Sequence, residues 1–226
     1  MVPSGNLGVR GEMRAAFFDI DGTIIRENSM ERIFLKYLME KGEFSLWDMF
    51  KYGALLFGDL FSFDMARVRG DKRYLRGKRC QEMDRLAEEC FRNAIRPKVS
   101  PWAVECIENH RKDGYGIVLI TGSVDILARP LSRYLGADHL ICTTVGTENG
   151  RYTGHCLTPY PYGETKRRLL EDFSRKKGID LSESYGYGDR HTDIPFLSSV
   201  GNPIAVNPDR KLHKYARRNR WKIVQF

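Results

Sequence analysis

Residues 14–23 read RAAFFDIDGT, a short apolar run that ends in Asp19 and continues into a loop with Asp21, Gly22 and Thr23. A run of this length and composition is typical of a strand that is buried on both faces of a parallel sheet. Such a strand delivers the following loop to the carboxyl edge of the sheet, where open α/β folds bind their ligands. The stretch therefore predicts an α/β fold with two carboxylates at a ligand site.

Further apolar runs alternate with helical patterns along the rest of the chain. Strands are predicted at residues 115–120, 139–142, 184–187 and 204–206, the last of these being the final strand. Residues 143–148 and 152–156 flank Asn149-Gly150 and predict a hairpin. Helices are predicted at residues 101–112, 125–134 and 166–177. This alternation indicates a doubly wound parallel sheet.

Residues 28–96 interrupt that alternation with apolar residues at helical spacing and no convincing strand. The predicted helices cover residues 30–40, 44–57, 63–69 and 83–95. We therefore expect a discontinuous core of residues 14–27 and 97–226, a helical cap of residues 28–96, and a flexible arm of residues 1–13. The apolar segment 46–63 is expected to form the core of the cap. The alternative is an apolar pocket wall that accepts an apolar or lipid-like phosphate monoester, or an interfacial surface.

The bulk properties favour anionic ligands without choosing among them. The net charge is +8, and basic residues are concentrated near the C-terminus at Arg210, Lys211, Lys214, Arg217, Arg218, Arg220 and Lys222. We interpret this cluster mainly as a solvated helix face, with a nucleic-acid patch as the less favoured alternative. The five cysteines form no zinc-ligand pattern, and no signal peptide or membrane span is apparent, so a cytoplasmic protein is expected.

Polar residues end several of the predicted elements: the Asp19 loop, Thr121-Gly122-Ser123, Lys166, and Asp189 with Asp193. Carboxylates gathered without histidine or cysteine suit Mg²⁺, and crowded ionised carboxylates need a cation to offset their repulsion. A lysine and the backbone N–H groups of a loop that leads into a helix suit a phosphate. The set predicts a phosphoryl group placed beside a carboxylate.

The chemistry of these residue types suggests a role for each. Asp19 is the expected nucleophile, and Asp21 is the expected acid and base for the leaving oxygen and the attacking water. Thr121 and the Gly122 amide would hold phosphoryl oxygens, and Lys166 would offset negative charge. Asp189 would complete a metal site that Asp193 supports.

The motifs FFDIDGT (17–23), LITGS (119–123), Lys166 and GYGDRHTD (186–193) together resemble the haloacid dehalogenase superfamily of phosphohydrolases, over about residues 14–206. The helical insertion and the ending VGNPIAVNPDRKL (200–212) resemble its phosphoserine-phosphatase-like branch, subfamily IB. The resemblance implies a Rossmann-like core with a C1-type cap, Mg²⁺ and an aspartyl-phosphate on Asp19. It places the metal on Asp19, the backbone carbonyl of Asp21, and Asp189.

The expected catalytic residues are Asp19, Asp21, Thr121 and Lys166; the phosphate- and substrate-binding residues are Gly22, Thr23, Gly122, Ser123 and Asn28; the metal residues are Asp19, Asp21, Asp189 and Asp193.

The sequence departs from that branch at Asn28, where the branch has a glutamate that anchors a substrate ammonium. An amide carries no charge, which argues against phosphoserine, although Glu27 and Glu31 are nearby. Arg190 is expected either to add charge at the phosphate or to face solvent, and His191 to be an ordinary loop histidine.

The predicted activity is Mg²⁺-dependent hydrolysis of a small phosphorylated metabolite. Histidinol phosphate, an amino-alcohol phosphate, and a glycerol- or lipid-type ester remain open as substrates. The alternatives are phosphotransfer through the same intermediate, and action on or binding of nucleic-acid ends.

Overall fold

The computed structural model describes residues 13–26, 29–43 and 72–226. Its main sheet has six strands in the order β3-β2-β1-β6-β7-β8, all paired in parallel. The strands are β1 Ala15–Phe18, β2 Gly116–Val124, β3 His139–Thr143, β6 Tyr185–Gly188, β7 Asn202–Val206 and β8 Lys222–Val224. The doubly wound parallel sheet predicted from the sequence is confirmed, with one correction. The prediction that residues 204–206 form the last strand is wrong, because β8 follows and pairs with β7.

Strand β1 lies in the middle of the sheet because its side chains are apolar on both faces. Ala16 and Phe18 belong to one buried cluster, and Ala15 and Phe17 belong to the other. The strand pairs with β2 on one side and β6 on the other, and the backbone N–H of Asp19 donates to Tyr187 O at 2.9 Å. The chain beyond β1 therefore leaves the sheet next to the ends of both neighbours.

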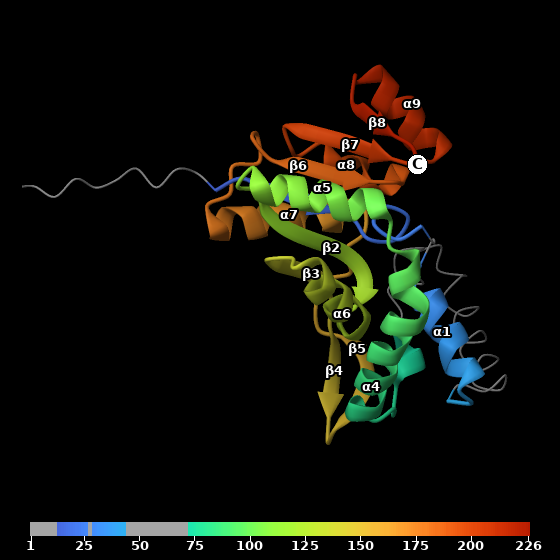
Figure 1. Cartoon of the computed structure of the whole chain (residues 1–226). Coiled ribbons are helices and arrows are strands. Elements are labelled where there is room, and N and C mark those ends of the chain that lie inside the picture. The colour runs from blue at the N-terminus through green and yellow to red at the C-terminus, as the bar shows by residue number, and fades with distance from the viewer. Residues whose placement is uncertain (1–12, 27–28, 44–71) are drawn as a thin grey trace, which may run out of the picture.

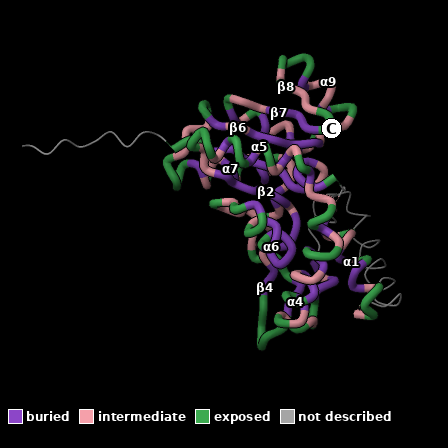
Figure 2. Tube along the Cα trace, viewed as in Figure 1, coloured by how far each residue is buried: buried purple, intermediate pink, exposed green. Residues whose placement is uncertain are grey.

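Helices cover both faces of the sheet (Figure 1). Helices α5 Pro101–Lys112 and α6 Asp125–Leu135 pack on one face, and α7 Glu164–Lys177, α8 Ile194–Leu197 and α9 Arg210–Arg218 pack on the other. Figure 2 shows the buried residues along the strands between these two layers.

The described part of the insertion is helical. It contains α1 Met30–Glu40, the short turn η1 Arg73–Leu75 and α4 Cys80–Cys90, which continues through a π-turn, η2 Phe91–Ile95. A 3-10 turn, η3 Arg96–Lys98, then leads back to the core. Ser29 caps α1 by accepting a hydrogen bond from the Arg32 N–H, and the buried side of α1 packs against α4 in the same cluster. The helices predicted at 44–57 and 63–69, and the apolar segment 46–63, lie outside the described residues.

The predicted hairpin is confirmed as β4 Val145–Glu148 and β5 Arg151–Cys156. Asn149 and Gly150 both have positive φ, 49° and 72°, as a tight hairpin turn of the primed type requires. Although the hairpin follows β3 in the sequence, its hydrogen bonds join it to the insertion. The N–H groups of Gly77 and Cys80 donate to the carbonyls of Tyr152 and Gly150, and the Tyr152 N–H donates to Lys78 O.

The basic residues near the C-terminus are all exposed, whereas Leu212 and Ala216 of α9 are buried against the sheet. This exposure agrees with a solvated helix face on α9, and a nucleic-acid patch would be exposed in the same way. Among the residues that the structure describes, no helix has the length and apolar content needed to cross a membrane.

Candidate active site

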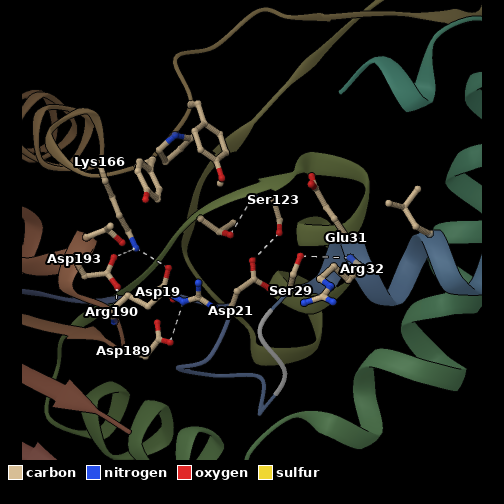
Figure 3. Close-up of a pocket in the computed structure, with 17 residues that line it drawn as sticks. Asp19, Asp21, Ser29, Glu31, Arg32, Ser123, Lys166, Asp189, Arg190 and Asp193 are labelled. Carbon is tan, nitrogen blue, oxygen red and sulfur yellow. Dashed lines mark hydrogen bonds and ion pairs between the residues drawn. The ribbon is translucent and has the colours of Figure 1, made fainter. Parts of the chain in front are cut away.

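A cavity of about 480 Å³ opens where the carboxyl ends of β1, β2 and β6 meet the insertion (Figure 3). One wall comes from the core and carries Asp19, Asp21, Thr121, Gly122, Ser123, Lys166, Asp189, Arg190, Thr192 and Asp193. The other wall carries Ser29, Glu31, Arg32 and Leu35 from α1 and its N-cap, and Tyr160, Pro161 and Tyr162 from the loop before α7. The expected residues from separate elements are therefore brought together.

Lys166 links two carboxylates at the bottom of the cavity. Its Nζ donates to Asp19 Oδ1 at 2.6 Å and to Asp193 Oδ1 at 2.7 Å, and its side chain is almost completely buried. Burial alone would lower the pKa of this lysine, but the attraction of Asp19 and Asp193 outweighs burial and raises it. Lys166 therefore stays charged beside the predicted nucleophile.

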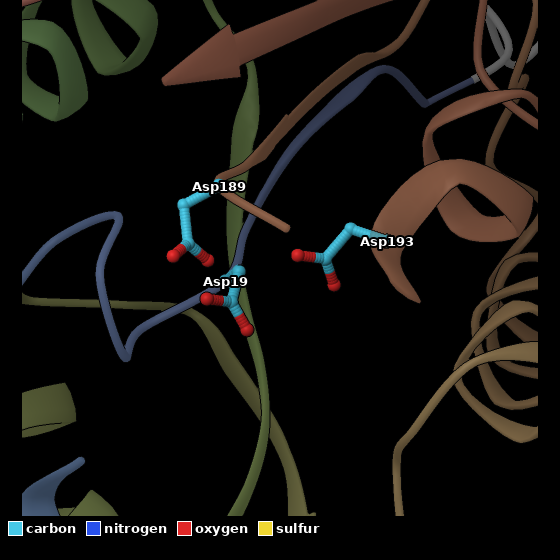
Figure 4. Close-up of side chains that lie close together, drawn as sticks. All are labelled: Asp19, Asp189 and Asp193. Atoms are coloured by element: carbon cyan, nitrogen blue, oxygen red, sulfur yellow. The ribbon is translucent and has the colours of Figure 1, made fainter. Parts of the chain in front are cut away.

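Asp19, Asp189 and Asp193 come close enough for oxygens of all three to lie within 4.8 Å of one another (Figure 4). Burial raises the pKa of Asp19 to about 7, with Lys166 opposing the rise. Burial, with the negative charges of Asp19 and Asp193, raises the pKa of Asp189 to about 8. Asp189 Oδ1 is buried and has no hydrogen-bond partner among the described residues. An all-oxygen cluster with an unsatisfied buried oxygen fits a hard divalent cation.

Gly22 allows this cluster to assemble. Its φ is +96°, and a Cβ built there would lie 2.1 Å from Asp189 Oδ2. A side chain at this position would therefore push against the Asp189 carboxylate as well as strain the backbone. Gly22 and Thr23 do not line the cavity themselves. Thr23 is buried behind it and donates to Asp19 Oδ2 at 3.3 Å, so both residues support the carboxylates.

Asp21 occupies a different part of the cavity. Its carboxylate accepts hydrogen bonds from the N–H of Met30 at 2.7 Å and from the Ser123 hydroxyl at 2.9 Å. It is not part of the group formed by Asp19, Asp189 and Asp193. Burial raises the pKa of Asp21 to about 6, although these two hydrogen bonds favour its charged form. The expected metal contact of Asp21 involved its backbone carbonyl, not this carboxylate.

The Thr121–Ser123 segment is the last part of β2 rather than the first turn of a helix, because α6 begins at Asp125. The Ser123 N–H is already bound to Thr121 Oγ1 at 3.1 Å, so the segment offers fewer free amides than the sequence suggested. A Cβ on Gly122 would lie 2.5 Å from the Tyr160 ring, which places that ring directly against the loop. Asn28 lies outside the described residues.

The family assignment comes from comparison with known proteins. The family model described as haloacid dehalogenase-like hydrolase matches residues 16–198, which contain every element that lines the cavity. The chain belongs to this family. It is a phosphoric monoester hydrolase, in agreement with the resemblance noted from its motifs.

Relatives of this hydrolase carry several names. The inhibition of morphological differentiation protein of Streptomyces azureus is 34% identical over 94% of this chain and 78% of its own length. A phosphoserine phosphatase of Mycobacterium tuberculosis is 28% identical over 94% and 70% of the two chains. A histidinol-phosphatase of Neisseria meningitidis is 27% identical over 93% and 98%. A solved structure of a Bordetella pertussis protein of unknown function has a TM-score of 0.80 and 26% identity, covering 94% and 98%.

Several wall residues of this hydrolase were not predicted as site residues. Tyr160 and Tyr162 lie in nearly parallel planes, with ring centroids 5.8 Å apart, on the loop that leads to Lys166. The sequence Tyr-Pro-Tyr-Gly directly before a basic helix could have drawn attention to them. Leu35 and Arg32 follow Glu31 on α1, but no sequence signal shows which side of that helix faces the cavity.

The two residues after Asp189 have different positions in this hydrolase. Arg190 lines the cavity, and its Nε lies 3.5 Å from Asp189 Oδ2. His191 does not line the cavity; its Nδ1 lies 2.7 Å from Oδ2 of Asp209, the N-cap of α9. The interpretation of His191 as a loop histidine agrees with this position.

Proposed function

We propose that this chain hydrolyses a small phosphate monoester with Mg²⁺, through a phosphoryl group carried on Asp19. The observation that carries the proposal is the arrangement around Asp19. Its carboxylate faces the cavity and is held by Lys166, while Asp21 stands on the same loop without a bond to that lysine. The cavity volume of about 480 Å³ suits a small metabolite.

In the first step, an oxygen of Asp19 attacks phosphorus and the bond to the leaving oxygen breaks. The leaving oxygen takes a proton from Asp21, so that an alcohol departs and a phospho-aspartate remains. In the second step, Asp21 removes a proton from water, which attacks phosphorus and releases phosphate and free Asp19. With a pKa of about 6, Asp21 can both donate a proton to the leaving oxygen and accept one from water near neutral pH.

The other residues act by charge and position. Lys166 offsets the repulsion between Asp19 and the phosphoryl oxygens, and Thr121 and Gly122 border the place where those oxygens would lie. Mg²⁺ held by Asp19 and Asp189, with Asp193 beside them, would supply further positive charge against the phosphoryl oxygens.

The test is phosphate release from a panel of small monoesters, with Mg²⁺ or with EDTA, by the native chain and by Asp19→Asn. We expect release that needs Mg²⁺ and falls to background in Asp19→Asn, and a loss of about 100-fold or more in Asp21→Asn. Asp172→Asn is the matched control, because that carboxylate is exposed on α7 and pairs only with Arg175 among the described residues. Acid-quenched native protein should carry a phosphoryl group on the peptide that contains Asp19.

Phosphate release that persists in Asp19→Asn would refute the nucleophile assignment. Transfer of the phosphoryl group to an added alcohol, with no free phosphate, would identify the chain as a phosphotransferase instead.

A further inference from the structure

An ion pair between a buried lysine and a partly buried glutamate stands in the cavity wall formed by α1. The Lys72 ammonium donates to Glu31 Oε1 at 2.5 Å, and the side chain of Lys72 is 1% exposed. The same Glu31 oxygen accepts from the Val124 N–H at 3.2 Å, directly after the Thr121–Ser123 segment. Glu31 lines the cavity and Lys72 stands behind it.

This pair changes what the carboxylate of Glu31 can do. A free carboxylate on a cavity wall would attract a substrate ammonium, but here the protein supplies the ammonium itself. Lys72 is also held from the other side, since its Nζ lies 5.3 Å from the centre of the Tyr160 ring. An incoming ammonium would have to compete with a buried partner that is already in place.

The next residue on α1 carries the opposite charge. Arg32 lines the cavity, and its guanidinium has no ion-pair partner among the residues that the structure describes. Figure 3 shows Arg32 near Ser29, across the cavity from Lys166. With Glu31 neutralised by Lys72, the charge that remains on this part of the α1 wall is positive.

We infer that the site selects phosphate esters whose leaving group carries a carboxylate and disfavours those whose leaving group carries an ammonium. Arg32 binds the carboxylate, and Lys72 acts as a positioning residue that keeps Glu31 from binding an ammonium. The inference rests on the proposed function and names the substrate class for the same cavity.

Three esters of nearly equal size test the inference: phosphoglycolate with a carboxylate, 2-hydroxyethyl phosphate with no further charge, and phosphoethanolamine with an ammonium. The quantity compared is kcat/KM relative to the uncharged ester, at low ionic strength with Mg²⁺. For an ester that turns over slowly, its inhibition constant against 4-nitrophenyl phosphate takes the place of kcat/KM. We expect phosphoglycolate to be favoured by about threefold to fivefold, because an exposed arginine forms a screened pair.

Variants assign the selectivity to the named residues. Arg32→Gln should remove the preference for phosphoglycolate, so that its kcat/KM relative to the uncharged ester falls to about one. Lys72→Met should raise kcat/KM for phosphoethanolamine by about tenfold relative to the uncharged ester, because the Glu31 carboxylate then lacks its ammonium partner. The double variant Glu31→Gln, Lys72→Met should lose that gain and avoids leaving a buried charge unpaired. Lys36→Gln is the control, since Lys36 is exposed on α1 outside the cavity and pairs with Glu40.

The outcomes separate the inference from the proposed function. Equal kcat/KM for the three esters, a preference for phosphoethanolamine, or ratios that none of the variants change would overturn the inference while the proposed function stands. If none of the three is hydrolysed and none competes with 4-nitrophenyl phosphate, the inference is overturned as well. Absence of 4-nitrophenyl phosphate hydrolysis would count against the proposed function itself.

Discussion

The Lys166 side chain holds two carboxylates of the site together. It is buried between Asp19 and Asp193, and both carboxylates depend on its charge. We expect Lys166→Met to lower kcat by about 100-fold or more, because a charge aimed at the developing negative oxygens is lost. In EDTA at about pH 8 it should also lower the free energy of unfolding by about 3–5 kcal/mol, as breaking a buried ion pair does.

Steady-state kinetics and denaturant unfolding measure these two effects. Lys176→Met is the control, because Lys176 is exposed on the same helix. A Lys166→Met protein with native activity would show that the lysine has no part in the chemistry.

The carboxylate cluster makes stability depend on pH when no metal is bound. The pKa values of Asp19 and Asp189 are raised to about 7 and about 8, mainly by burial, so between about pH 4 and 8 the native state binds protons that the unfolded state has released. Stability therefore decreases as pH rises through this range. In EDTA, the denaturant concentration at the midpoint of unfolding should be lower at about pH 8 than at about pH 5. Adding Mg²⁺ at about pH 8 should raise it again. The fall should be smaller in Asp189→Asn; equal midpoints at both pH values without metal would contradict the prediction.

Most of the site residues that the sequence predicted lie at or just after the ends of predicted strands. Asp19 comes directly after an apolar run, Asp21 lies two residues further on, and Asp189 comes just after the strand predicted at 184–187. A carboxylate at the carboxyl end of a strand in a parallel sheet lies at the edge where ligands bind. Lys72 was missed because it begins a basic stretch with Arg73, Arg76, Lys78 and Arg79, and nothing in the sequence shows which cation is buried. Its burial depends on Glu31, a partner 41 positions away, which only the folded chain brings near.

The conformation of the loop after β1 depends on the absence of a side chain at Gly22. We expect Gly22→Ala to displace Asp189, since the added Cβ would lie 2.1 Å from its Oδ2. The concentration of Mg²⁺ that gives half-maximal activity should rise by about 10- to 100-fold, as for changes next to metal ligands. Gly42→Ala is a matched control, because Gly42 also has a positive φ, +73°, but no atom within 4 Å of the added Cβ. If both variants reach half-maximal activity at the same Mg²⁺ concentration as the native chain, the close approach of Gly22 to Asp189 does not affect Mg²⁺ binding.

The elements themselves were predictable to different degrees. The apolar part of strand β2 and the Asn149-Gly150 turn were predicted correctly, because an apolar run and an Asn-Gly pair each indicate their own local structure. Strand β8 has only three residues, and its pairing with β7 comes from the return of the chain after α9. A strand defined by its neighbour rather than by its own composition leaves little trace in the sequence.

The exposed face of α9 carries five of the 37 lysine and arginine residues of the chain, and no carboxylate pairs with them among the described residues. We expect the double variant Arg217→Gln, Arg218→Gln to change the unfolding free energy by no more than about 0.5 kcal/mol, because solvated surface residues contribute little. Hydrolysis of a small ester should change by less than about twofold, measured against the native chain at the same salt concentration. A large loss of activity on ends of single-stranded oligonucleotides, with small esters unaffected, would instead support a nucleic-acid surface.

The hairpin β4–β5 has a consequence for how this protein can be re-engineered. The predicted cap of residues 28–96 lies between β1 and α5 in the sequence, and a transplant from a relative that exchanges those residues alone leaves the hairpin behind. The hydrogen bonds of Gly77, Lys78 and Cys80 with Gly150 and Tyr152 mean that such a graft would arrive without the strand that holds it. A chimaera that exchanges residues 145–156 together with the insertion keeps these hydrogen bonds. Two separate pieces of the gene therefore form one exchangeable module.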